Sequence, residues 1–352
     1  MQRWIPILAA VLCAQLLIAG ALALRKDALA TRPPSAPFVT APIGTADQIA
    51  IEGPAKAAAA APRVVLQKRG TNWVVHSDYD VPVGKSKVAD LLRRFTALRR
   101  GLAIADTPQA LRRFKVDGHR FARRLTFSRG GKMLATVYLG ESTGLHQSDA
   151  RTNGERAVYT VGVATYDVPA TGTGWIDAQM LQIPSDDIVA LDVGGTSGAP
   201  LRLTRKLVAN GTPGPWTAAA LPRGRSLDAT KIAALTRAID EMRVDKVLGE
   251  RANPDWQAGH PQLTLTIESA ATKATATAKA TIWTLSKPKS GDFVVLKSSA
   301  QPWYFSLNSG EAQPLLDAAE PGGLFATPPG KTHAKKVAGR KIPPTGAPVG
   351  VK

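Results

Sequence analysis

The sequence has little of what disulfide scaffolds, metal centres and covalent active sites require. It has one cysteine, Cys13, among 352 residues, which excludes a disulfide framework and a multi-cysteine zinc site. No two of its five histidines lie within ten residues of each other, so a local histidine-based zinc motif is absent from the sequence. A Gly-x-Ser-x-Gly elbow and a phosphate-binding loop ending in Gly-Lys-Ser/Thr are absent too. We therefore expect a non-enzymatic protein with no catalytic residue, metal or cofactor.

Negative charge is also scarce, and the positive excess is uneven. The chain has 45 Lys and Arg against 27 Asp and Glu, a net charge of +18. Residues 63–132 alone hold 17 basic and 5 acidic residues, and residues 327–352 hold 6 basic and no acidic residues. Residues 133–326 are close to neutral, with 17 basic and 19 acidic residues. The search for a partner therefore begins with one basic stretch and the basic tail.

Charge is absent from the N-terminal run of residues 4–24, which is almost entirely apolar. These 21 residues would form a helix of roughly 30 Å, the thickness of the hydrocarbon core of a bilayer. We expect residues 1–26 to be an uncleaved signal-anchor. The alternative is a cleaved signal peptide, since Ala21-Leu22-Ala23 resembles a cleavage site. Arg3 and the N-terminal amino group before the run balance Arg25 and Lys26 after it, so the positive charges barely discriminate its orientation.

Two proline-rich segments flank the middle of the chain. Residues 27–46 are rich in Pro, Ala and Thr, which predicts an extended spacer. Residues 327–352 combine Pro and Gly with basic residues and few large apolar side chains, which predicts a disordered basic tail.

Two segments have the apolar periodicity of an amphipathic helix. In residues 85–100 the apolar stripe is Val88, Leu91, Leu92, Phe95 and Leu98. In residues 228–244 it is Ile232, Leu235, Ile239 and Met242, and Asp228 is well placed to cap the helix. A shorter helix is expected to begin at Asp106.

Similar strand-like segments surround both long helices in the same order. Val64-Val65-Leu66 matches Leu201-Arg202-Leu203, Trp73-Val74-Val75 matches Trp216-Thr217-Ala218, and Leu125-Thr126-Phe127 matches Leu265-Thr266-Ile267. The strand at 47–51 matches that at 187–191, and the strand at 158–161 matches that at 303–307. We therefore predict an α+β protein with an N-terminal transmembrane helix followed by two tandem repeats of antiparallel sheet plus amphipathic helix. The predicted units are a basic first unit at 47–183 and a second unit at 184–326.

Several short motifs resemble the domain of unknown function 4340 family. They are Trp73-Val74-Val75, the helix at 88–98, the turn at 111–116, Leu139-Gly140-Glu141, the strand at 158–161 and the Trp175 segment at 175–181. Phe114-Lys115-Val116 stands where members of that family usually carry a triplet like Tyr-Gly-Leu. The resemblance implies a membrane-anchored envelope protein, often associated with ABC-type transport or gliding-motility systems, and it brings no catalytic residue.

The basic stretch supplies the binding residues that the sequence predicts. We expect contact with an anionic surface from eight arginines: Arg93, Arg94, Arg99, Arg100, Arg112, Arg113, Arg123 and Arg124. Three interpretations remain open: anionic lipid headgroups, nucleic acid, and a solvated face without a ligand. Nucleic acid is the least expected ligand, because few aromatic residues lie among these arginines in the sequence, and those few mostly occupy core-like positions.

Together these features predict a single-pass inner-membrane protein with its soluble part in the periplasm or outside the cell. Its expected role is that of an accessory or assembly factor of a transport or envelope system, with a membrane protein or transporter as partner. Two alternatives are an envelope hydrolase with a site between the two units, and a membrane-tethered basic module that binds nucleic acid or an acidic polymer.

Overall fold

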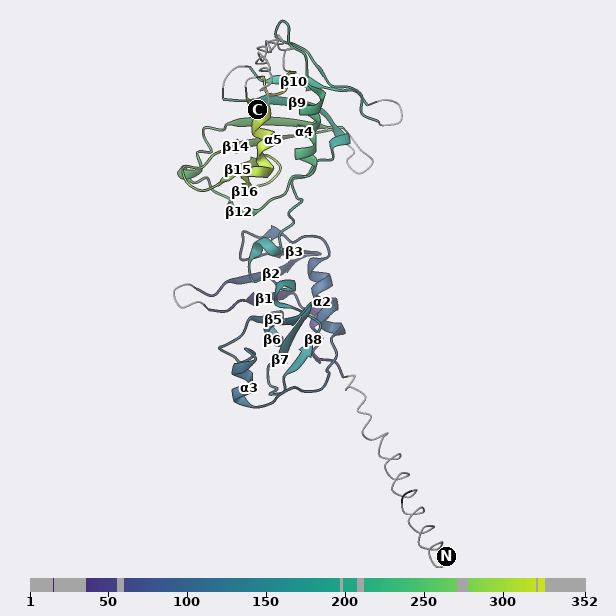
Figure 1. Cartoon of the computed structure of the whole chain (residues 1–352), viewed down its shortest axis with the longest axis vertical. Helices are drawn as coiled ribbons and strands as arrows, with labels where there is room; N and C mark the ends of the chain where they lie inside the picture. The colour runs from purple at the N-terminus through teal and green to yellow at the C-terminus, as the bar shows by residue number, and fades with distance from the viewer. Residues whose placement is uncertain are drawn as a thin grey trace, which may run out of the picture.

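The chain folds into an α+β structure with two large antiparallel sheets and few helices (Figure 1). The computed structural model describes residues 15, 36–55, 60–196, 199–207, 212–270, 278–320 and 322–326. Within these residues, no helix is both long enough and apolar enough to cross a membrane. The predicted anchor, apart from Gln15, the first part of the predicted spacer and the predicted tail lie outside the described residues.

The first sheet has eight strands in the order β4-β3-β2-β1-β5-β6-β7-β8. Its strands are β1 (Gln48–Glu52), β2 (Arg63–Arg69), β3 (Asn72–Val75), β4 (Val81–Pro82), β5 (Arg123–Arg129), β6 (Lys132–Gly144), β7 (Gln147–Thr152) and β8 (Tyr159–Val161). Its helices are α2 (Lys87–Ala97) and α3 (Pro108–Arg113), with 3₁₀ turns η1 (Ile43–Thr45), η2 (Thr165–Asp167) and η3 (Gly172–Gly174).

The second sheet also has eight strands, in the order β11-β10-β9-β13-β14-β15-β16-β12. Its strands are β9 (Ile188–Gly194), β10 (Leu201–Thr204), β11 (Thr217–Ala218), β12 (Lys246–Gly249), β13 (Leu263–Ser269), β14 (Lys279–Ser286), β15 (Phe293–Ser298) and β16 (Tyr304–Asn308). Its helices are α4 (Ala229–Asp240) and α5 (Ser309–Ala319), with 3₁₀ turns η4 (Ser185–Asp187) and η5 (Pro254–Trp256).

Helix α2 packs on the first sheet through the stripe that the sequence predicts. Val88, Leu91 and Phe95 are buried, and the Phe95 ring lies 5.7 Å from the ring of Phe127 in β5. Full burial of a side chain of this size contributes about 1.5–3 kcal/mol, so the stripe, more than helix propensity, holds α2 in place.

Helix α4 is the counterpart of α2 in the second sheet. Ile232, Leu235 and Ile239 are buried, as the apolar period predicts. The predicted cap is confirmed, since the Asp228 carboxylate accepts hydrogen bonds from the amides of Thr230 and Lys231 at 2.9 and 3.2 Å.

The short helix α3 begins later than the sequence predicts. The expected cap was Asp106, but the Thr107 hydroxyl accepts the hydrogen bond from the Ala110 amide at 3.2 Å. The reason is Pro108, which occupies the first helical position, where its missing N–H costs nothing, and so makes Thr107 the capping residue.

The two sheets have equivalent registers around their central strands. In the first sheet Ile49 of β1 pairs with Leu66 and Phe127, and in the second Leu191 of β9 pairs with Leu203 and Ile267. The pairing partners match the segments aligned from the sequence. The predicted match of the strand at 47–51 with that at 187–191 is two residues out of register. It aligns Ile49 with residue 189, whereas the pairings show that Ile49 corresponds to Leu191.

Part of the predicted spacer belongs to the folded core. Phe38 and Ile43 are 0% and 1% exposed, and Val39 is also buried. The amide of Phe38 donates to the Leu98 carbonyl at 3.0 Å, and the amide of Arg100 donates to the Ala36 carbonyl at 2.9 Å. The interpretation of residues 27–46 as an extended spacer is therefore wrong for its second half, because its apolar residues pack against the sheet despite the prolines.

The two sheets meet end to end, with contacts from the Tyr79 turn and from Ala178 (Figure 1). The Trp303 indole donates to the Tyr79 carbonyl at 3.2 Å, and the Tyr79 hydroxyl reaches the Leu248 carbonyl at 3.4 Å. A further bond joins the Val244 amide to the Ala178 carbonyl at 2.9 Å. Gly249 lies against the Tyr79 ring, and its φ of +145° is a backbone conformation that residues with a side chain rarely adopt. These contacts between the two sheets are made by Trp303, by Tyr79 and by backbone groups. They lie where the hydrolase alternative expects an active site.

Candidate functional site

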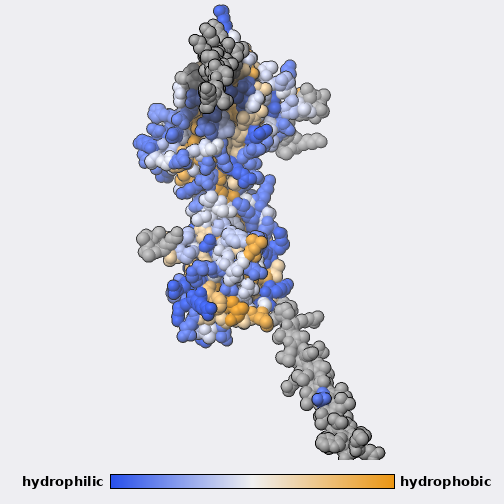
Figure 2. All heavy atoms as spheres, viewed as in Figure 1, coloured by the Kyte–Doolittle hydropathy of each residue, from blue (hydrophilic) through white to orange (hydrophobic). Residues whose placement is uncertain are grey.

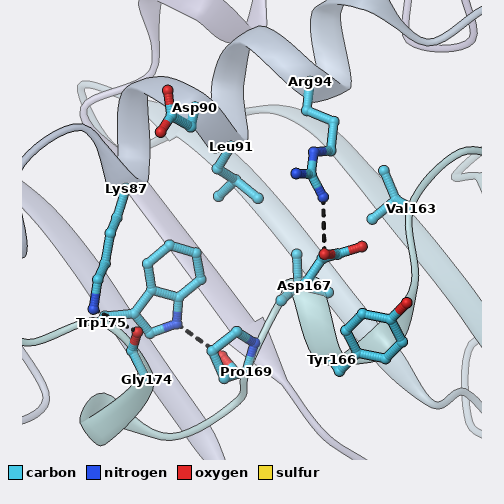
Figure 3. A pocket seen from close by; sticks show the side chains of 11 residues that line it. Lys87, Asp90, Leu91, Arg94, Val163, Tyr166, Asp167, Pro169, Gly174 and Trp175 are labelled. Carbon is cyan, nitrogen blue, oxygen red and sulfur yellow. Dashed lines mark hydrogen bonds and ion pairs between the residues drawn. The ribbon is translucent and has the colours of Figure 1, made fainter. Parts of the chain in front are cut away.

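A cleft of about 450 Å³ opens between α2 and the segment that follows β8 (Figure 3). Helix α2 contributes one wall, with Lys87, Leu91 and Arg94. Residues 163–175 contribute the other wall, including the turns η2 and η3. The cleft therefore joins side chains that lie more than 70 positions apart in the sequence.

The apolar part of the cleft is built on Trp175. This residue is 3% exposed, and its indole N–H donates to the Pro169 carbonyl at 2.8 Å. Figure 3 shows the indole lying between Lys87 and Pro169, with Leu91 above it. Because the polar edge of the indole is satisfied by a carbonyl, its orientation is fixed and the ring forms a firm wall.

Lys87 ties the first turn of α2 to the far wall. Its ammonium group donates to the carbonyls of Gly174 and Ile176, each at 3.0 Å. Burial lowers the pKa of Lys87 from its ordinary value, and the nearby carboxylate of Asp177 opposes this shift. The amine is therefore a structural donor whose three protons are largely committed.

At the other end of the cleft, Asp167 gathers several donors. Its carboxylate lies 3.0 Å from the Arg94 guanidinium, accepts the Ala164 amide at 2.9 Å and faces the His146 ring at 3.3 Å. Burial acts to raise the pKa of Asp167, but the hydrogen bonds from Ala164, Arg94 and His146 outweigh it and hold the pKa below its ordinary value. Asp167 is therefore ionised near neutral pH and balances Arg94.

Charges in the cleft are thus matched within the protein. Arg94 pairs with Asp167, and Asp90 pairs with Arg93 at 2.7 Å. Tyr166 stands half exposed at the rim. Such an arrangement suits a neutral side chain with an apolar body and a polar tip better than it suits a free anion. Within the described residues, no group of three or more His, Cys, Asp and Glu side chains is placed to hold a metal ion.

The second sheet has a cleft of about 530 Å³ in the equivalent place, between α4 and α5. Lys231 occupies the position of Lys87, and its ammonium group donates to the Phe325 carbonyl at 3.0 Å. The backbone agrees, since the Gly84 amide donates to the Trp175 carbonyl while the Asp228 amide donates to the Leu324 carbonyl, both at 2.9 Å. In each sheet the closing segment therefore returns to the start of the main helix, and a lysine binds it there.

Four of the eight predicted arginines are engaged with the protein. Arg94 pairs with Asp167, and Arg100 pairs with Glu155 at 2.6 Å. Arg124 pairs with Glu52, and Arg123 donates to the Val168 carbonyl at 2.9 Å, while burial lowers its pKa. These side chains help to hold the first sheet together, and their positive charges are partly neutralised by their carboxylate and carbonyl partners.

The other four arginines lie at the surface. Arg93 is exposed and pairs with Asp90, its neighbour on α2. Arg99 is exposed just after α2, and Arg112 and Arg113 are exposed on α3. The structure thus separates four arginines that bind other elements of the first unit, of which Arg94 is still exposed, from four exposed arginines on α2, on α3 and just after α2.

Sequence reasoning missed the cleft itself. Lys87 was not among the predicted site residues, and Trp175 entered only as part of the family resemblance. Asp167 lies 73 positions from Arg94, so no local spacing connects the two residues. The usable signal was the matched pair Lys87 and Lys231, because a lysine at the same place on both predicted helices indicates a shared contact.

The strand order and the two clefts define an α+β protein of two similar sheets, each closed by a segment that returns to its main helix. The chain belongs to the family described as Domain of unknown function (DUF4340), whose model matches residues 73–264. The match begins at β3 and ends in β13, so it covers parts of both sheets. No curated protein and no solved structure matches the chain.

Proposed function

We propose that the protein is a single-pass accessory or assembly factor of the cell envelope, with both sheets on the outer side of the inner membrane. The uncharged run at residues 4–24 carries this proposal, because its length matches the hydrocarbon core of a bilayer. Residues 25–35 separate this run from Ala36, where the chain joins the first sheet, and eleven residues span at most about 40 Å. The first sheet would therefore stay close to the membrane.

The two sheets are, in this proposal, copies of one unit made by duplication. The equivalent registers and the lysines that bind the closing segments support it. Two copies of one unit can diverge in the surfaces that they present, because function resides in the sites that a fold carries.

The cleft of the first sheet is the proposed contact for a partner protein of a transport or envelope system. Its charges are already matched, its wall is the fixed indole of Trp175, and Tyr166 is exposed at the rim. These properties favour an amphipathic side chain from a partner chain.

Membrane fractionation with reporter fusions tests the anchor and its orientation. The full chain is expected to stay in the membrane during alkaline extraction, and deletion of residues 1–26 is expected to release it. A reporter fused after Lys352 is expected to be active only in its periplasmic form. Release of the full chain, or a reporter active in the cytoplasm, would overturn the proposal.

A photo-crosslinking residue at Tyr166 tests the partner contact in membranes. The control is the same residue at Ile282, which is exposed on β14 of the second sheet, away from the cleft. We expect a discrete crosslinked product from position 166 and none of that size from position 282. Identical products from both positions would contradict a partner contact at the cleft.

A further inference from the structure

The connection between α2 and α3 exposes a short apolar segment. Leu102 is 62% exposed and Ile104 is 45% exposed, and Ala103 between them is exposed too. Among the large apolar side chains that the structure describes as exposed, these two are the nearest to each other in sequence. Single exposed apolar residues are ordinary, but three in succession on one loop call for an explanation.

The segment is held in place at both ends. On one side the Arg100 amide donates to the Ala36 carbonyl at 2.9 Å, and the Arg100 side chain pairs with Glu155. On the other side the Ile104 amide donates to the Val158 carbonyl at 2.9 Å, and the Val158 amide donates to the Ala105 carbonyl at 2.8 Å. Leu102 and Ala103 are therefore exposed between two fixed ends. Binding a partner through them should lose little conformational entropy, because the loop is already ordered.

The place of the segment is set by the entry of the N-terminal chain. Leu102 is two residues from Arg100, which is bonded to Ala36, so its backbone lies within about 13 Å of the point of entry. Residues 4–24, which precede that point, are the proposed anchor. Figure 2 shows exposed apolar surface at this end of the first sheet, the end away from the second sheet.

Positive charge surrounds the apolar segment. Arg99 precedes it by three positions, Arg112 and Arg113 follow on α3, and Arg156 lies two positions before Val158, which is bonded to Ile104; all four are exposed. The acidic residues near them are Asp106, on the same connection, and Asp117, whose charge acts on Arg112. Arg99 reaches only carbonyls of its own turn, at 3.4 Å, and Arg113 lies over the Phe114 ring at 5.7 Å. Short apolar side chains flanked by cations suit the interface of an anionic bilayer, where the apolar groups enter and the cations meet headgroups.

We propose that residues 102–104 are a membrane-contact loop, which inserts into the headgroup region of an anionic bilayer while Arg99, Arg112 and Arg113 bind its phosphates. This proposal rests on the proposed function, because the anchor delivers the loop to the bilayer. It gives three of the eight predicted arginines a ligand of stated chemistry, and it fixes the first sheet in one orientation on the membrane.

Fluorescence quenching by lipids tests the loop in the full chain. The chain carries Cys13→Ser and a single new cysteine, Ala103→Cys, labelled with an environment-sensitive dye. It is reconstituted into vesicles of phosphatidylcholine alone or mixed with phosphatidylglycerol, each with brominated acyl chains as quencher. The matched control carries the dye at Ala220→Cys, an exposed site on the second sheet.

In anionic vesicles we expect quenching at position 103 to exceed quenching at position 220 by about threefold. The double variant Leu102→Ser/Ile104→Ser is expected to remove this excess, whereas Leu221→Ser, an equally conservative change at another exposed leucine, leaves it unchanged. The double variant Arg112→Gln/Arg113→Gln is expected to lower quenching toward the level seen in neutral vesicles, because Arg99 alone remains to bind phosphates.

Alkaline extraction of the same vesicles distinguishes failure of the membrane-contact loop from failure of the proposed membrane anchor. If the chain resists extraction and position 103 is quenched no more than position 220, the loop proposal fails and the anchor stands. Equal quenching in neutral and anionic vesicles overturns the anionic ligand. Release of the chain at high pH overturns the proposed function, and quenching at position 103 then decides the loop contact separately.

Discussion

The lysine that closes each sheet allows a direct test of the repeated architecture. Lys87→Met removes the ammonium group and keeps the length of the apolar stem. The carbonyls of Gly174 and Ile176 then lose a donor at 3.0 Å each and can be reached by water, because the contact is only partly buried. The closing segment should therefore open more often, while α2 keeps its buried stripe.

The size of the effect follows from the contacts. A hydrogen bond to a charged group contributes about 1.5–3 kcal/mol, and the partial exposure of Lys87 and the cost of desolvating its ammonium reduce this. We take about 1 kcal/mol for each of the two bonds, and about 2 kcal/mol for the pair. Since 1.4 kcal/mol is a factor of ten, opening of the segment should become about 30-fold more frequent. Lys231→Met removes one exposed bond and should change opening by about twofold.

Native-state hydrogen exchange on the full chain measures this opening. The reporting amide is that of Asp177, which donates to the Pro82 carbonyl at 3.0 Å. The internal control is the Asp228 amide, which closes the second sheet and should be unaffected by Lys87→Met. Unchanged exchange at Asp177, or equal acceleration at both amides, would refute the assignment of Lys87 as a local tie.

Three further outcomes are expected. Asp167→Asn should make the stability of the first sheet depend less on pH in acid. The lowered pKa of Asp167 contributes stability that is present above its ordinary pKa of 3.8 and is lost as the pH falls through the pKa of the folded state. The thermal midpoint of the variant should therefore fall less between pH 7 and pH 3 than that of the unchanged chain. Gly140→Ala should destabilise the first sheet by about 1–3 kcal/mol in denaturant unfolding, because its new methyl would collide with the Phe114 carbonyl, whereas Gly162→Ala, which has open space, should be nearly neutral. Lys115→Gly should leave the free energy of unfolding unchanged or raise it by up to about 1 kcal/mol, because Lys115 has φ of +54°. Lys115→Ala should lower the free energy of unfolding. If glycine lowered it as much as alanine, the backbone at Lys115 would not be strained.

The helices and the pairing of strands could be predicted wherever the signal was local. The stripes of α2 and α4 are buried as their period requires, and the Asp228 cap forms. Helix α5 was missed, because its buried Ala312, Leu315 and Ala318 make a weak stripe and Pro314 lies inside the helix. Its position comes from packing against α4, a tertiary contact that a local pattern does not record.

The site was harder to predict because its parts are distant in sequence. The eight arginines were chosen by charge alone, and charge does not show which of them meet a carboxylate or a carbonyl in the fold. Arg100 and Arg124 are paired with glutamates in other elements, whereas Arg112 and Arg113 remain at the surface. The family resemblance sets a Tyr-Gly-Leu-like triplet against Phe114-Lys115-Val116, and the left-handed backbone at Lys115, with φ of +54°, is one that glycine adopts without strain.

The bonds that join Ala36 and Phe38 to the end of α2 also have a mechanical meaning. If the proposed anchor holds the chain in a membrane, any tension that a partner exerts against it enters the folded chain at this point. It is borne first by the two backbone bonds to Leu98 and Arg100, and then by the buried ring of Phe38, which packs edge-on against Tyr159 at 6.0 Å. The same few residues would therefore both fix where the proposed tether enters the folded chain and carry its load into the first sheet.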